Sequence, residues 1–172
     1  MFGIFTNMIH KCKMSDISRI CFIINEAARG YDGVIPHDCY HQPYMPVFEL
    51  EREMQRMTFY GWKVYGELVG VMGIEPVKDV TLVRHAYVLP LWQNKGIGAR
   101  LLKYLVSLVK TRRLLVGTWA ANKNALRFYE RYGFNFRPEK DELLKTYWDI
   151  PTRQIETSVV LELSISLGVN RL

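Results

Sequence analysis

Three features are scarce or absent in this sequence of 172 residues: paired cysteines, long apolar runs and low-complexity segments. The three cysteines, Cys12, Cys21 and Cys39, are odd in number and irregularly spaced, which argues against a disulfide framework and against a zinc site. Sparse cysteine makes a reducing, cytoplasmic compartment the expected default. No stretch approaches the ~20 apolar residues of a membrane-spanning helix, and the first residues lack the basic leader of a signal peptide.

The composition that remains is that of a folded protein. Hydrophobic residues make up 49% of the chain and aromatic residues 13%, so the chain can bury a sizeable core as one domain of residues 1–172, with its core at about 8–163 and a tail at 164–172. The net charge of +6 favours an anionic partner. The sequence carries no nucleic-acid motif and no interleaving of aromatic with basic residues, so a small polyanionic ligand is the better expectation.

A glycine-containing loop, Gln93-Asn94-Lys95-Gly96-Ile97-Gly98-Ala99, follows an apolar run at 80–89 and opens a helical pattern at 99–110. Glycine lets the backbone turn sharply and come close to a ligand. The first N–H groups of a helix lack intrahelical partners and carry partial positive charge, so the loop predicts a phosphate site. Neither a P-loop nor a dinucleotide fingerprint fits, because Ala99-Arg100 and Leu101 stand where those motifs need lysine–serine and a third glycine.

A second motif lies downstream, from Asn122 through Ala125 and Tyr129 to Gly133-Phe134. Together with the spacing Gln93-x-x-Gly96-x-Gly98, it resembles the Gcn5-related N-acetyltransferase (GNAT) family. The resemblance implies an α+β (α/β three-layer) fold. It has a mixed, mostly antiparallel sheet of about six to seven strands, helices on both faces and a splayed parallel strand pair.

The periodicity of apolar residues and the turn residues predict the individual elements. Ser15 is the expected N-cap of the first helix, and Tyr132 is expected on the inner face of the helix that Asn122 caps. Segment 31–45, which contains prolines and several aromatic and ionisable residues, is either a substrate lid or a surface connection. The expected strands are 8–13, 59–65, 68–74, 80–89, 114–119, 134–136 and 157–163, and the expected helices are 16–28, 47–57, 99–110, 123–132 and 140–147.

The resemblance also implies a cosubstrate, acetyl-CoA, and residues that hold it. The loop would wrap the pyrophosphate, the backbone at 86–88 would bond the pantetheine arm, and Tyr129 would be the general acid that protonates the leaving thiolate. The oxyanion would be held by the backbone N–H of Val88. The expected cofactor-binding residues are Ala86, Tyr87, Val88, Gln93, Asn94, Lys95, Gly96, Ile97, Gly98, Ala99, Arg100, Asn122, Ala125 and Tyr129.

The sequence does not decide which side chain is the general base. Some members of the family carry a glutamate at the position of Gly117 or of Arg84, and this chain carries neither. Glu75 and His85 are the two candidates, and Arg84 suggests either an anionic substrate or a charge pair. The expected function is transfer of an acetyl group to a primary amine of an unidentified small molecule or peptide, with no metal, no nucleic acid and no membrane. The alternative is a catalytically silent CoA-binding module, and a homodimer contact near Tyr147-Trp148 is conceivable.

Overall fold

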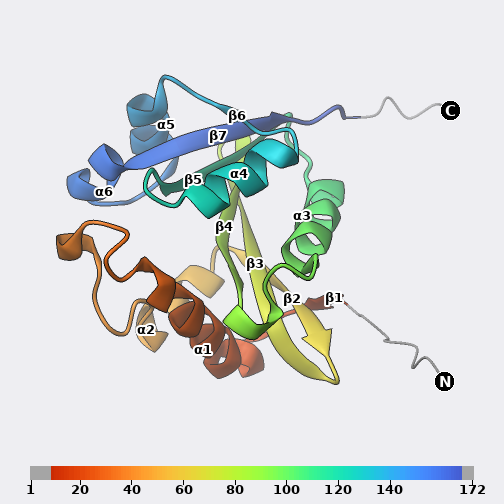
Figure 1. The fold of residues 1–172 in the computed structure, drawn as a ribbon. Helices are drawn as coiled ribbons and strands as arrows, with labels where there is room; N and C mark the ends of the chain where they lie inside the picture. Colours follow the sequence, from red (N-terminus) through yellow and green to blue (C-terminus); the bar gives the residue numbers. More distant parts are fainter. Residues whose placement is uncertain (1–8, 168–172) are drawn as a thin grey trace, which may run out of the picture. The chain divides into compact units, whose positions relative to one another are not determined.

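The computed structural model describes residues 9–167, in which the chain forms two compact units. Unit 1 contains residues 9–30, 41–75 and 84–107, and unit 2 contains 31–40, 76–83 and 108–167. Within the described residues the seven strands follow the order β1-β2-β3-β4-β5-β7-β6 (Figure 1). The pair β4–β5 is parallel, whereas β1–β2, β2–β3, β5–β7 and β6–β7 are antiparallel. The predicted fold class, a mixed and mostly antiparallel sheet with one parallel pair, is confirmed.

The element bounds agree with the predicted ranges to within a few residues. The strands are β1 Ile9–Lys11, β2 Thr58–Val64, β3 Glu67–Val77, β4 Val80–Val88, β5 Arg113–Trp119, β6 Asn135–Phe136 and β7 Ser158–Ser164. The α-helices are α1 Ile17–Ala28, α2 Val47–Met54, α3 Ile97–Leu108, α4 Lys123–Arg131, α5 Lys140–Tyr147 and α6 Thr152–Thr157. The core was predicted to start at about residue 8 and the tail to cover 164–172. Residue 8 and the last part of this tail lie outside the described residues.

In unit 1, helices cover both faces of the strands. Val71 of β3 belongs to a buried cluster with Ile24 of α1 and Leu50 of α2. The preceding residue, Gly70, faces Ile97 at the start of α3, because a Cβ built on Gly70 would lie 3.0 Å from the Ile97 side chain. Successive residues of a strand point to opposite faces. Therefore α3 packs on the face opposite to α1 and α2.

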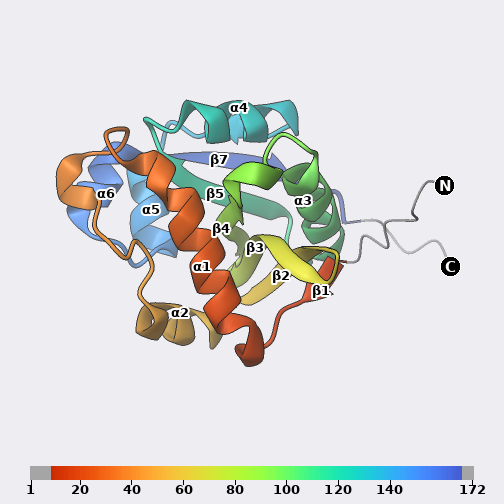
Figure 2. The same cartoon turned by 60° about the horizontal axis from the view of Figure 1, so that its bottom comes forward.

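In unit 2, α5 and α6 pack on one face of β5 and β7. Leu115 of β5 and Val160 of β7, both fully buried, form a core cluster with Leu143 and Leu144 of α5 and Ile155 of α6. Helix α4 lies on the other side of these two strands (Figure 2). Apolar side chains of β5 and β7 therefore pack against helices on both faces of this part of the sheet.

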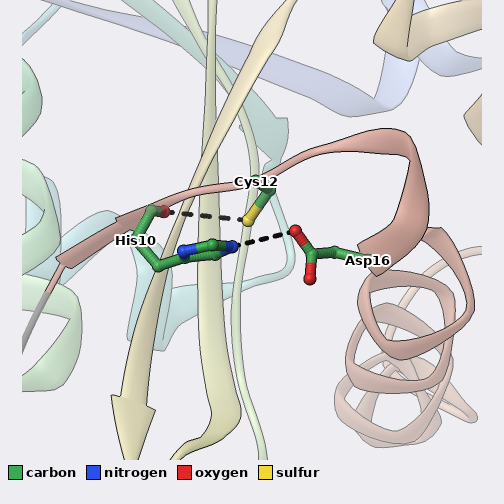
Figure 3. Close-up of side chains that lie close together, drawn as sticks. All are labelled: His10, Cys12 and Asp16. Atoms are coloured by element: carbon green, nitrogen blue, oxygen red, sulfur yellow. Dashed lines mark hydrogen bonds and ion pairs between the residues drawn. The ribbon is translucent and has the colours of Figure 1, made fainter.

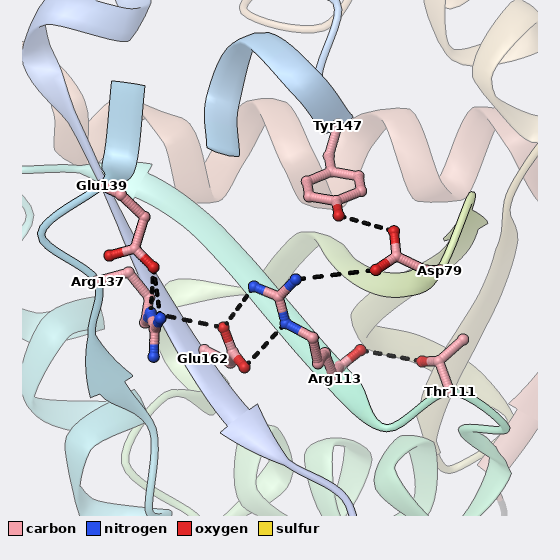
Figure 4. A network of polar contacts seen from close by, with 7 residues as sticks. All are labelled: Asp79, Thr111, Arg113, Arg137, Glu139, Tyr147 and Glu162. Atoms are coloured by element: carbon pink, nitrogen blue, oxygen red, sulfur yellow. Dashed lines mark hydrogen bonds and ion pairs between the residues drawn. The ribbon is translucent and has the colours of Figure 1, made fainter. Parts of the chain in front are cut away.

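A polar network ties β5 to β7 at the start of β5 (Figure 4). The Arg113 guanidinium donates to both carboxylate oxygens of Glu162, at 3.0 and 2.9 Å. Arg137 forms a further ion pair with Glu162 at 3.7 Å, and Arg113 reaches Asp79 at 3.9 Å. Asp79 in turn accepts a hydrogen bond from the Tyr147 hydroxyl at 2.7 Å. Glu162 is buried, so this network gives a carboxylate in the sheet its counter-charges.

Several local predictions are wrong. Ser15 is not the N-cap of α1; that position is Asp16, whose carboxylate accepts a hydrogen bond from the Lys13 N–H at 2.8 Å. Tyr132 is 41% exposed and does not belong to the inner face of α4. Tyr147 and Trp148 are half-buried rather than exposed, while the homodimer contact expected near them stays a prediction.

Helix α6 was missed because Pro151 reads as a helix breaker. In the structure Pro151 is the N-cap of α6, with φ −61° and ψ 151°. Proline is accepted at the beginning of a helix, since its missing N–H would have no partner there. The same residue therefore ends the preceding segment and starts the next helix.

Candidate active site

The glycine loop projects from unit 1 between β4 and α3. Residues 93–96 are exposed, whereas Ile97 is buried and anchors the first turn of α3. Asn94 has a φ of 58° and Gly96 a φ of 78°, both in the left-handed region. These two residues turn the chain within a few positions from the end of β4 into the helix. The first N–H groups of α3 therefore face away from the helix body, as a phosphate site requires.

Two cations flank the loop. The Lys95 ammonium lies 5.0 Å from the ring centroid of Trp92, and the Arg100 guanidinium lies 5.4 Å from that of Trp62. Arg100 also donates a hydrogen bond to the Lys95 carbonyl at 3.4 Å. The aromatic contacts orient both side chains without neutralising them. Positive charge thus stands on both sides of the exposed amides.

The base of the loop is fixed by two contacts. Gln93 donates a side-chain hydrogen bond to the Val88 carbonyl at 2.9 Å, which closes the loop onto the end of β4. A Cβ on Gly70 would come within 3.0 Å of Ile97 and 3.1 Å of Val88. Glycine at position 70 therefore allows α3 and the end of β4 to approach β3 closely.

The parallel pairing of β4 with β5 is short. Among the described residues it joins Thr81 to Leu114, Leu82 to Leu115 and Val83 to Val116. Strand β4 itself continues to Val88, through the predicted pantetheine-binding backbone at 86–88. The early end of this ladder agrees with the splayed parallel pair that the family resemblance implied.

A cluster of charged side chains lies beside the second half of β4; Glu53, Glu75 and Arg84 are largely buried, whereas Arg56 is 47% exposed. Arg84 donates to Glu75 at 2.7 Å and to Glu53 of α2 at 3.2 Å. Arg56 completes the cluster, at 3.0 Å from Glu75 and 3.7 Å from Glu53. With two carboxylates and two guanidinium groups, the cluster is balanced. Of the two readings of Arg84, the charge pair is therefore the one observed.

His85 joins this cluster through its Nε2 atom, which forms an ion pair with Oε2 of Glu53. Both atoms are fully buried, and within residues 9–167 neither has another hydrogen-bond partner. The imidazole stacks on Phe59, with ring centroids 5.9 Å apart. The contact with a carboxylate favours a proton on Nε2, which leaves Nδ1 as the basic nitrogen.

Burial alone would raise the pKa of Glu53. The hydrogen bond and charge of His85, followed by the charges of Arg84 and Arg56, instead lower the pKa below its ordinary value of 4.5. Glu53 is therefore ionised at neutral pH and can orient His85. Both oxygens of Glu75 already contact guanidinium groups, Arg84 at 2.7 Å and Arg56 at 3.0 Å. Of the two base candidates, the geometry favours His85.

Glu53 was missed by the sequence reasoning, although a signal is present. Leu50 and Glu53 stand three residues apart and are the two buried residues of α2. A glutamate that occupies a core-facing position of an otherwise charged helix needs a counter-charge. That periodicity predicts a buried carboxylate but does not say which cations meet it.

Unit 2 carries the three remaining predicted site residues, Asn122, Ala125 and Tyr129. Asn122 is the N-cap of α4 and accepts a hydrogen bond from the Ala125 N–H at 3.2 Å. Tyr129 is buried, with its ring 5.1 Å from Phe128 and 5.2 Å from Phe134. Burial raises the pKa of Tyr129 well above its ordinary value. The phenol therefore stays protonated and remains a hydrogen-bond donor.

Gly117 in β5, where some family members place an acidic residue, has a packing explanation. A Cβ at this position would lie 3.3 Å from Leu144 and from the indole of Trp148. A glutamate there would displace the Trp148 ring. The missing carboxylate thus follows from how α5 and the segment after it cover β5.

The comparison with known proteins identifies the family. The model of the acetyltransferase (GNAT) family matches residues 20–134, more than half of the chain. The chain belongs to this family. It is thus a member of a family of acyl-CoA-dependent acetyltransferases, as the two motifs predicted.

Two curated relatives from Bacillus subtilis are similar over a short stretch. The spermine/spermidine N(1)-acetyltransferase of strain 168 and the probable spermine N(1)-acetyltransferase of subsp. natto strain BEST195 are each 37% identical over 54 residues. This stretch covers 29% of the chain, and it spans only 36% of the length of each relative.

Solved structures share the fold over nearly the whole chain. The PaiA N-acetyltransferase from Thermoplasma acidophilum in complex with coenzyme A has a TM-score of 0.72 at 16% identity, covering 92% of this chain and 99% of that one. The ribosomal-protein-S18-alanine N-acetyltransferase from Escherichia coli has a TM-score of 0.68 at 18% identity, covering 97% and 99%. At such identities the likeness shows the fold alone.

Helices long and apolar enough to cross a bilayer are not found between residues 9 and 167.

Proposed function

We propose that the protein transfers an acetyl group from acetyl-CoA to a primary amine. The observation that carries the proposal is the exposed loop at 93–96, whose turn at Asn94 and Gly96 presents the start of α3 and which lies inside the residues that the family model matches. Its flanking cations, Lys95 and Arg100, suit a pyrophosphate. The residues present therefore fit CoA.

The family resemblance assigns roles to residues of both units. In unit 1, the loop and the backbone of Ala86, Tyr87 and Val88 would hold the cosubstrate, and the Val88 N–H would stabilise the oxyanion. In unit 2, Asn122 and Ala125 would contact the cofactor arm, and Tyr129 would act on the leaving thiolate. Both units contribute to the matched residues 20–134, which favours one acetyltransferase domain in residues 1–172.

His85 is the base in the proposed mechanism. A lysine-like amine has a pKa of about 10.4, so it must lose a proton before or during attack. Nδ1 of His85 accepts that proton, directly or through water, while Glu53 stabilises the imidazolium. The amine nitrogen bonds to the acetyl carbon, the carbon–sulfur bond breaks, and the thiolate leaves with a hydrogen bond from the Tyr129 hydroxyl. Because burial raises the pKa of this phenol, Tyr129 keeps its proton and stabilises the thiolate as a hydrogen-bond donor, and the proton taken by His85 returns to solvent.

The test is free-thiol release from acetyl-CoA with a panel of amines. The panel includes spermine, spermidine and a peptide with an N-terminal alanine, since the similar proteins are named for these acceptors. His85→Asn should lower kcat by about 10²–10⁴-fold with little change in CoA affinity. Asparagine suits this position because, like histidine, it tolerates a positive φ. His37→Gln is the matched control, because His37 is exposed and lies outside the cluster.

The alternative is a catalytically silent CoA-binding module. It predicts that CoA binds while no amine releases thiol, and that His85→Asn changes nothing. The buried ion pair between His85 and Glu53 favours the enzyme, since a silent module has no need of a paired imidazole. The cytoplasmic compartment and a homodimer stay predictions. If CoA does not bind at all, both the acetyltransferase and the silent CoA-binding module are excluded.

A further inference from the structure

A second group of polar side chains, distinct from the His85 cluster, lies in unit 1, and Figure 3 shows its three members close together. His10 comes from β1, Cys12 follows that strand, and Asp16 ends the 3-10 turn that leads into α1. One ligand atom from each of these residues lies within 4.8 Å of the others. Nε2 of His10 is 2.9 Å from Oδ2 of Asp16.

We propose that His10, Cys12 and Asp16 bind a zinc ion. Imidazole nitrogen, thiolate sulfur and carboxylate oxygen are the three ligand types that zinc takes in proteins. Ligand atoms around a tetrahedral zinc lie roughly 3–4 Å apart, so these side chains need only small movements. The fourth position is left for water, because the side chains of His10 and Asp16 are 27% and 21% exposed.

The backbone holds the three residues in place. The Cys12 N–H donates to the Phe59 carbonyl at 2.9 Å, and the Asp16 N–H donates to the Lys13 carbonyl at 2.9 Å. The Lys13 N–H also bonds the Asp16 carboxylate. Zinc would thus join a sheet edge to the start of α1 without any change of backbone.

A simpler account explains two of the three residues. A hydrogen bond between His10 and Asp16, with Asp16 capping the turn, needs no metal. Cys12 also belongs to the buried apolar cluster of unit 1, so packing alone accounts for its burial. Packing does not require a thiol, whose polar contact among residues 9–167 is a 3.8 Å approach to the His10 carbonyl. The sequence predicted no metal site, because the cysteines are odd in number and irregularly spaced.

Binding requires loss of the thiol proton. Formation of the zinc–sulfur bond releases this proton to solvent, and no electrons are exchanged.

Cobalt(II) titration of the chelator-treated full chain tests the proposal. A site that contains a thiolate should give one equivalent of tetrahedral cobalt with a sulfur-to-metal charge-transfer band, displaced by one equivalent of zinc. Cys12→Ser should abolish the band, and His10→Gln and Asp16→Asn should weaken binding by at least about 100-fold, the upper effect of outer-shell changes. Cys39→Ser is the matched control, because Cys39 is free and lies in unit 2.

The outcomes separate cleanly. Absence of one-to-one binding at micromolar cobalt, or a band that survives Cys12→Ser, overturns the site. Loss of the band in Cys39→Ser instead places the metal elsewhere and also overturns it. If Cys12→Ser fails to fold, Asp16→Asn decides the question, because asparagine keeps an oxygen that can accept the Lys13 N–H. The readout needs neither CoA nor an amine, so it is independent of the proposed acetyl transfer.

Discussion

Replacing Glu53 by glutamine tests the buried charge cluster directly. The substitution keeps the size of the side chain but removes a carboxylate that is 7% exposed. That carboxylate faces Arg84 at 3.2 Å, Arg56 at 3.7 Å and the imidazole of His85. After the change, Glu75 is left to balance two guanidinium groups.

The expected loss of stability follows from these contacts. Removing one partner of a buried ion pair costs about 3–5 kcal/mol. Here Arg84 keeps its 2.7 Å contact with Glu75, and a glutamine oxygen still accepts a hydrogen bond, so we expect a smaller loss of roughly 2–3 kcal/mol. Single domains have only about 5–15 kcal/mol in total, which makes the effect easy to measure.

The lowered pKa of Glu53 decides how the loss of stability should change with pH. The pKa of Glu53 is lowered by folding, so its contribution is fully present above the ordinary value of 4.5 and is lost as pH falls through the lower folded value. Urea unfolding of both proteins should therefore show a difference that is largest near pH 7 and shrinks below pH ~4. Glu49→Gln, at an exposed position of the same helix, is the control.

Two outcomes would refute this reasoning. One is a difference between Glu53→Gln and the native protein that stays constant between pH 7 and pH 3. The other is a Glu53→Gln protein as stable as Glu49→Gln at neutral pH. The first result would mean that the loss does not come from the charge of Glu53, and the second that the ion pairs of Glu53 contribute nothing to the free energy of unfolding.

Three further predictions concern other parts of the chain. Gly70→Ala should cost about 1–3 kcal/mol, because its Cβ presses on Ile97, and should weaken CoA binding severalfold in calorimetry; unchanged CoA affinity would contradict the role of Gly70. Glu162→Gln should lower the free energy of unfolding in urea by roughly 1–2 kcal/mol, a modest loss because Arg113 is partly exposed. An unchanged free energy of unfolding would show that the network does not stabilise the fold. Tyr129→Phe should lower kcat roughly 100-fold, the low end for a general acid, with CoA affinity retained; equal turnover would remove Tyr129 from the mechanism.

The glycine loop and α4 could be predicted from the sequence, because neighbouring residues determine them. The loop needs only consecutive residues: two glycines, a strand that ends before them and a helix, predicted from residue 99 and observed from Ile97, that follows the first of them. Asn122 caps α4 through its neighbour Ala125, and Gly133, with a φ of 88°, closes the same helix. Each signal lies within a few positions of the structure it specifies, and each was confirmed.

The partners of the buried charged side chains could not be predicted in this way. Arg84 was recognised as needing a partner, but its partners stand 9 and 31 residues away along the chain. Which carboxylates meet it depends on the packing of α2 beside β3 and β4, and no local rule supplies that. The same holds for Gly117, whose reason is the Trp148 ring, from a segment after α5.

The conformation of His85 connects the cluster to the site. Tyr65, Lys78, His85 and Asn94 are the non-glycine residues between 9 and 167 with positive φ, and His85 is the one among them that lies inside a strand rather than at a turn or loop. A left-handed residue costs about 1–3 kcal/mol and persists only where its surroundings fix it.

The ion pair with Glu53 and the stack on Phe59 provide that fixation. The paired ladder of β4 with β5 stops at Val83, two residues before His85, while β4 itself continues to Val88. A left-handed residue at this point bends the strand locally, and in the proposed function the backbone N–H groups at 86–88 would face the ligand. The carboxylate of Glu53 would thus hold both the proposed base and the backbone bend that the proposed CoA site requires.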